Sequence, residues 1–102
     1  MIPKNRVTTH PGEILQEEFL NPLGISQSSL ARHIGVRHFV ICNLVHGKRS
    51  VTPRLALMLG RALGTSPEFW MGLQSDFDVS SFLNSTEAKR AMTIKPLAQA
   101  GS

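Results

Sequence analysis

The chain has 102 residues, of which 41% are hydrophobic, which suits one globular domain with a small core and excludes disorder throughout. A single cysteine excludes an internal disulfide bond and fits a reducing compartment. No apolar run reaches the length of a membrane span, and residues 1–6 lack the apolar core of a signal peptide, so we expect a cytoplasmic protein.

Charge is distributed unevenly along the sequence, although the formal net charge is only +4. Residues 19–67 contain no Asp or Glu. The same stretch carries the cations and histidines Arg32, Arg37, Lys48, Arg49, Arg54, Arg61, His33, His38 and His46. Such a distribution predicts one face with a positive field, which attracts a polyanion and makes its binding depend on salt. The alternative is a merely soluble basic surface.

The first segment with a helical pattern is residues 8–20, and it opens with His10-Pro11-Gly12-Glu13. Pro11 suits its first helical position, and Leu15 and Phe19, four residues apart, supply an inward edge. We expect residues 21–24 to end this helix, because a proline and a glycine within three residues do not continue one.

Residues 27–47 predict two short helices joined by a tight turn. Ser26 caps the first of them, and Gly35 ends it in the left-handed conformation that glycine adopts without strain. Small or apolar residues fall where the two helices must press together, namely Leu30, Ala31, Ile34, Val36, Ile41 and Leu44. This pattern is typical of a helix-turn-helix, whose second helix lies in the major groove of DNA. The alternative is an αα-hairpin in some other small helical protein, which shows similar spacing. The full set of small and apolar residues is much harder for such a hairpin to match by chance.

Two further helices are predicted to begin in the same way. Thr52-Pro53 and Ser66-Pro67 each place a capping residue before a proline at the first helical position. The first of these helices ends at Gly64, and its inward stripe consists of Leu55, Met58, Leu59 and Ala62. The second helix carries on one side Phe69, Trp70, Leu73 and Phe77. Five short helices without a strand pattern predict an all-α bundle over residues 1–82.

Residues 83–102 form the predicted C-terminal tail. Residues 86–92 have the composition of about two helical turns, but an isolated helix of that length is marginal in water. We expect this tail to be a short helix or partly disordered unless a second subunit orders it.

Two motifs outside the helix-turn-helix carry a family resemblance. These are His10-Pro11-Gly12-Glu13 and Ser66-Pro67-Glu68-Phe69-Trp70. Together with residues 27–47 they resemble HigA-type antitoxins, in the lambda-repressor-like group, over residues 9–77. The resemblance implies a five-helix lambda-repressor-like domain and a homodimer that binds a palindromic operator in front of its own operon. It also implies a partner, an mRNA-cleaving toxin of the RelE-like fold that the antitoxin holds inactive.

The second helix of the pair would present its outer face to DNA bases. At 100° per residue, the residues that face outward or lie at the edge are Phe39, Cys42, Asn43, His46 and His38. The family usually has polar residues at several of these positions, so Phe39 is a departure. It either contacts a thymine methyl group or folds back over the core, and Asn43 is the better candidate for a hydrogen bond to a base. Predicted phosphate contacts lie at helix ends or in the following loop, at Gln27, Ser28, Arg37, Lys48 and Arg49.

The toxin surface is a separate prediction. Glu13, Glu17 and Glu18 cluster on the first helix, outside the basic stretch, and would complement a basic toxin. The alternative is an inhibitory segment in the tail that folds onto the toxin.

Other classes of function are less well supported. His38, Cys42 and His46 share one helical face, and His33 or His10 would have to complete a zinc site. The three residues span about 12 Å, too far for all of them to reach one ion. A redox switch at Cys42 is a further alternative. We expect no cofactor, no metal and no enzymatic activity, because the sequence has no phosphate-cradling glycine loop and no catalytic triad. A stand-alone repressor without a toxin remains the main alternative.

Overall fold

The computed structural model describes residues 7–97 and is all-helical, with no strand in that range. A first continuous helix consists of α1 (Pro11–Ile14), η1 (Leu15–Leu20) and α2 (Asn21–Leu23). The helices that follow are α3 (Gln27–Ile34), α4 (His38–Val45), α5 (Pro53–Leu63), α6 (Pro67–Leu83) and α7 (Thr86–Ala91). Within the described residues there are therefore six helices, namely the five predicted ones and α7 in the tail.

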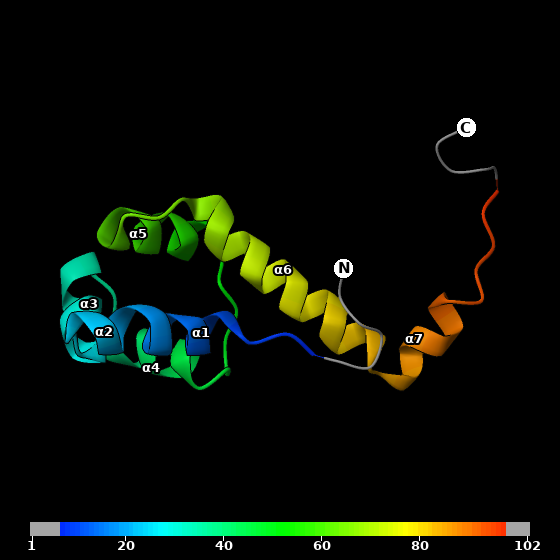
Figure 1. Ribbon diagram of the computed structural model, residues 1–102, viewed down its shortest axis with the longest axis horizontal. Helices are drawn as coiled ribbons and strands as arrows, with labels where there is room; N and C mark the ends of the chain where they lie inside the picture. The colour runs from blue at the N-terminus through cyan, green and yellow to red at the C-terminus, as the bar shows by residue number, and fades with distance from the viewer. Residues whose placement is uncertain (1–6, 98–102) are drawn as a thin grey trace.

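The helices form a body with one projecting arm. Figure 1 shows α1 to α5 and the first turns of α6 packed together, while the rest of α6 and α7 extend away from them. The extents of 50 × 28 × 22 Å reflect this length of α6. Residues 7–10, which precede α1, run toward α6, where the Thr8 N–H donates to Ser80 Oγ at 3.0 Å.

One hydrophobic core lies between the helices of the body. It is formed by Leu15, Leu20, Leu30, Ala31, Ile41, Leu44, Val51, Leu55, Ala56, Leu59 and Trp70. Trp70 is fully buried, and its indole Nε1 donates to Thr65 Oγ1 at 2.7 Å. Trp70 therefore belongs to the core of a single chain.

The predicted helix starts and stops after residue 25 are confirmed. The side chains of Ser26, Thr52 and Ser66 each accept a hydrogen bond from the N–H three residues later, at 3.0, 3.2 and 3.1 Å. Gly35 and Gly64 end α3 and α5 with φ of 80° and 75°. These boundaries form because each signal acts within one helical turn.

The prediction for the first helix is right at its start and wrong at its end. The helix begins at Pro11, the predicted first helical position, with His10 as its cap, but it continues through Pro22 to a left-handed Gly24. The reason lies in η1, where the Asn21 N–H donates to Gln16 O, five residues earlier. This wider π turn removes the α-helical register in which a proline ring would clash with the carbonyl four residues before it.

The predicted inward side of α6 is right for Trp70 and wrong for Phe69. Phe69 is 40% exposed and packs edge-on against Trp70, with ring centroids 5.1 Å apart. Adjacent helical residues differ by 100° in direction, so only one of these two rings can enter the core. Leu73 and Phe77 are half-buried.

Candidate nucleic-acid interface

The turn between α3 and α4 holds the two helices against each other. The N–H groups of Gly35 and Val36 both donate to Ala31 O at 2.9 Å, and Ala31 is buried at the crossing. Ile41 and Leu44 lie on the inner face of α4 and are completely buried. The outer face of α4 is consequently turned away from the core.

The His-Pro-Gly-Glu motif sets the position of α4. His10 Nδ1 accepts a hydrogen bond from the Gly12 N–H at 2.9 Å and so caps α1. A Cβ atom on Gly12 would lie 1.7 Å from Leu44 O and 2.9 Å from the Cα of Val45. Because only glycine fits there, α1 begins directly on the last turn of α4. The sequence pattern did not reveal this contact.

The outer face of α4 carries the residues predicted to read bases. Phe39 is 52% exposed, so it does not fold back over the core. His38 is exposed, and Cys42 and Asn43 are half-buried. His46 is exposed as well, but its Nδ1 lies 2.8 Å from Cys42 O, which ties one edge of the ring to its own helix.

The residues predicted to contact phosphate differ in their surroundings. Ser28, Arg37 and Lys48 are exposed, and Arg49 is half-buried. Gln27 is half-buried, and its Nε2 donates to the side chain of Gln16 at 2.9 Å. The side-chain nitrogen of Gln27 therefore already donates one hydrogen bond within the protein.

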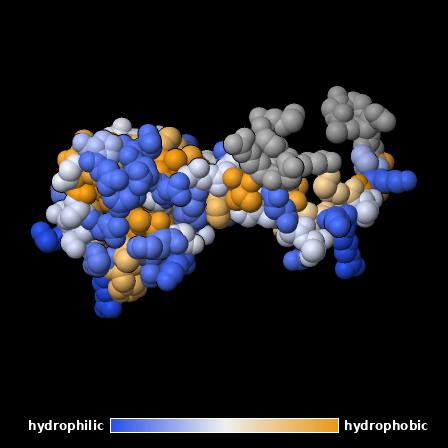
Figure 2. Space-filling view, turned by 60° about the horizontal axis from the view of Figure 1, so that its bottom comes forward, coloured by the Kyte–Doolittle hydropathy of each residue, from blue (hydrophilic) through white to orange (hydrophobic). Residues whose placement is uncertain are grey.

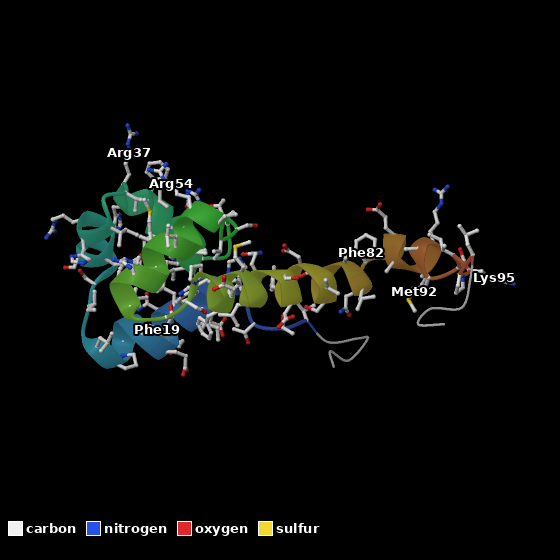
Figure 3. The ribbon with its side chains drawn as sticks, turned by 90° about the horizontal axis from the view of Figure 1, so that it is seen from above. Phe19, Arg37, Arg54, Phe82, Met92 and Lys95 are labelled. Atoms are coloured by element: carbon white, nitrogen blue, oxygen red, sulfur yellow. The ribbon has the colours of Figure 1, made fainter. Side chains whose placement is uncertain are left out.

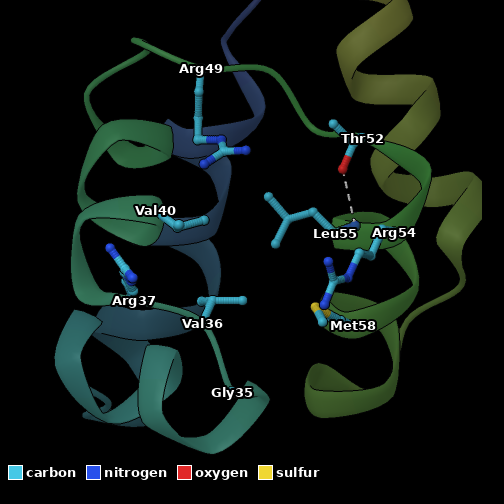
Figure 4. A pocket seen from close by; sticks show the side chains of 9 residues that line it. All are labelled: Gly35, Val36, Arg37, Val40, Arg49, Thr52, Arg54, Leu55 and Met58. Carbon is cyan, nitrogen blue, oxygen red and sulfur yellow. Dashed lines mark hydrogen bonds between the residues drawn. The ribbon is translucent and has the colours of Figure 1, made fainter.

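A groove between α4 and α5 brings three arginines together. It has a volume of about 290 Å³, and its apolar walls include Val40 and Leu55. Arg37, Arg49 and Arg54 line it from three different elements, as the close view shows (Figure 4). Figure 3 shows Arg37 and Arg54 at the same edge of the body. Arg54 was not among the predicted contact residues, although it follows the Thr52-Pro53 helix start directly after the basic loop.

The acids predicted to contact a toxin are accessible. Glu13, Glu17 and Glu18 are exposed, the first on α1 and the other two on η1. Their role stays a prediction.

Residues 7–97 contain no group of three His, Cys, Asp or Glu side chains that could hold a metal ion. Within the same residues, no helix combines the length and the apolar character needed to cross a bilayer.

The α3–α4 pair and the accessible outer face of α4 define a helix-turn-helix protein. No protein-family model matches the chain. Antitoxin HigA-1 of Vibrio cholerae is 38% identical over 86 residues, which cover 84% of this chain and 80% of that protein. The chain belongs to the HigA-type antitoxin family.

Two solved structures are similar along nearly their whole length. Pseudomonas aeruginosa antitoxin HigA with the higBA promoter superimposes with a TM-score of 0.81 at 36% identity, covering 88% of this chain and 98% of that one. Antitoxin GraA in complex with its operator superimposes with a TM-score of 0.85 at 32% identity, covering 97% and 100% of the two chains. The projecting arm is therefore part of the shared fold.

Proposed function

We propose that this chain is a cytoplasmic antitoxin rather than an enzyme. As a homodimer it binds its own operator and represses its own operon, and it neutralises a RelE-like mRNA-cleaving toxin. The observation that carries the DNA-binding part is α4, whose inner face is buried through Ile41 and Leu44 while Phe39 is half exposed on the other face. The basic residues flank this helix, and the acids lie on other elements. The two similar structures that contain promoter or operator DNA further support the proposal that this chain binds DNA.

In the proposed complex α4 lies in the major groove. The Asn43 amide donates to or accepts from a base edge, and Phe39 contacts a thymine methyl group. Arg37, Lys48 and Arg49 neutralise phosphates on either side and fix the register of the helix. We add Arg54 to this set, because it shares the α4–α5 groove with Arg37 and Arg49.

The homodimer is proposed to form through the projecting arm. Apolar side chains on this arm are exposed, with Val79 at 50%, Phe82 at 45%, Met92 at 54% and Ile94 at 77%. Figure 2 shows apolar groups on the arm, and Figure 3 shows Phe82 and Met92 well away from the body. A second copy would cover this surface and place two recognition helices about 34 Å apart. One such module alone buries too little surface for operator-level affinity.

The toxin is proposed to contact the first helix. Glu13, Glu17 and Glu18 offer three exposed negative charges outside the basic face. Opposite charges across an interface speed association and fix register. DNA and toxin would then bind to different surfaces of the same protein. An inhibitory tail is the alternative arrangement.

Two experiments test these proposals. A fluorescence anisotropy titration with the DNA in front of the gene should give tight, salt-dependent binding, and equal affinity for a scrambled duplex would contradict operator recognition. Substitution of Glu13, Glu17 and Glu18 by glutamine separates the two toxin surfaces and leaves the proposed dimer contacts of the arm in place. Lost neutralisation of the toxin encoded beside this gene, with intact operator binding, supports the first helix, whereas retained neutralisation assigns that role to the tail.

A further inference from the structure

Gln74 is a buried polar residue in the middle of α6, and its side chain links α6 to the loop between α4 and α5. Its side chain is 4% exposed. The Oε1 atom accepts a hydrogen bond from the Val51 N–H at 2.8 Å, and the Nε2 atom donates to Asp78 Oδ1 at 2.9 Å. The amide has a single orientation, because only its oxygen can accept and only its nitrogen can donate.

The loop that Gln74 holds carries two of the proposed phosphate contacts. Residues 46–52 join α4 to α5 and include Lys48 and Arg49. At the start of the loop, the Lys48 N–H donates to Asn43 O at 2.8 Å. At its end, Val51 is 3% exposed and is bound to Gln74, 23 residues later in the chain. The loop is thus tied at one end to the recognition helix and at the other to α6.

His10 lies beside the same loop and the same part of α6. Its ring meets Phe77 edge-on, with centroids 4.7 Å apart, and a Cβ atom on Gly47 would lie 3.9 Å from that ring. Burial lowers the pKa of His10, while a backbone hydrogen bond at Arg49 and the charges of Asp78 and Glu13 oppose this. The loop therefore packs against α6 through His10 as well as through Gln74.

We propose that Gln74 is a positioning residue for DNA binding, which holds the 46–52 loop from α6 so that Lys48 and Arg49 face the DNA backbone. The inference rests on the proposed DNA-binding function. Leucine, of similar size, would leave the buried Val51 N–H without a partner. Asp78→Ala would keep the bond to Val51 but remove the group that orients the amide.

Limited trypsin digestion tests the loop without DNA, since trypsin cleaves after Lys48 and Arg49. We expect Gln74→Leu to be cleaved there about tenfold faster than the wild type, the factor that corresponds to one lost buried hydrogen bond. The matched control is Thr65→Val, which removes the hydrogen bond to buried Trp70 between α5 and α6. It lowers stability at another place and should leave cleavage in the loop unchanged at a temperature where both variants are folded.

Salt titration of DNA binding supplies the functional readout. If Lys48 and Arg49 lose their contacts, the slope of log affinity against log salt falls by about 0.9 for each, about eightfold in affinity per contact at 0.1 M salt. Operator and unrelated duplexes should be affected equally. Asp78→Ala, at an exposed position, should change cleavage and slope less, in the same direction.

Equal loop cleavage and equal salt slopes in Gln74→Leu and Thr65→Val would overturn the positioning role. Failure of the proposed function looks different, because the wild type itself would then show no salt-dependent binding to DNA. The trypsin comparison would still decide whether Gln74 holds the loop.

Discussion

Substitution of Gly12 by alanine should displace the recognition helix. The new Cβ atom would lie 1.7 Å from Leu44 O, whereas ordinary contact begins at 3.4 Å, so α1 and α4 must separate by roughly 1.7 Å. The atom in the way belongs to the backbone and cannot rotate aside. Overpacking of this kind costs typically about 1–3 kcal/mol, and we expect about 3 kcal/mol or more here. That corresponds to a melting temperature lower by roughly 12 °C or more in a domain of this size.

The assay is thermal unfolding followed by circular dichroism, with operator binding measured below the transition. Gly72→Ala is the matched control, because Gly72 lies within α6 and a Cβ atom there meets nothing within 4 Å. Alanine in a helix interior should stabilise that variant by about 0.5–1 kcal/mol. The reasoning is refuted if Gly12→Ala melts at the wild-type temperature and binds the operator as tightly.

Arg54→Gln should flatten the salt dependence of DNA binding by about 0.9, whereas Arg61→Gln, which removes the same charge from the same helix outside the arginine-lined groove, should not; equal effects would mean a diffuse positive field. Phe82→Ser combined with Ile94→Ser should shift sedimentation from dimer to monomer with helical content retained, and an unchanged dimer would exclude the arm as the interface. Because burial places the folded-state pKa of His10 below its ordinary 6.5, the unfolded chain takes up the proton first, so stability falls as pH drops below about 6.5. His10→Asn, which still caps a helix but does not titrate, should show a smaller fall in the free energy of unfolding than the wild type, and equal pH profiles would assign the loss to other groups.

Most of the fold was predictable because its signals are local. A capping serine or threonine, a following proline and a terminal glycine each act within one helical turn, so Ser26, Thr52, Ser66, Gly35 and Gly64 fixed the boundaries of α3, α5 and α6. The helix-turn-helix was predictable for the same reason, since its packing partners are separated by few residues.

The features that sequence reasoning missed depend on contacts between distant segments. Gly12 meets Leu44 across 32 residues, and Gln74 meets Val51 across 23. The π turn of the first helix accompanies a side-chain hydrogen bond from Gln27 to Gln16, which no local sequence pattern predicts. The groove that adds Arg54 to the proposed interface likewise exists only after α5 has packed against α3 and α6.

The central claim, that the outer face of α4 reads the operator, is tested most directly with Asn43→Ala. Its affinity should be measured by fluorescence anisotropy for the operator and for a scrambled duplex of the same length, at one salt concentration. We predict a loss of about 1–3 kcal/mol on the operator and little change on the scrambled duplex. Unchanged binding to both duplexes, or an equal loss on both, would contradict the assignment of this face to base recognition.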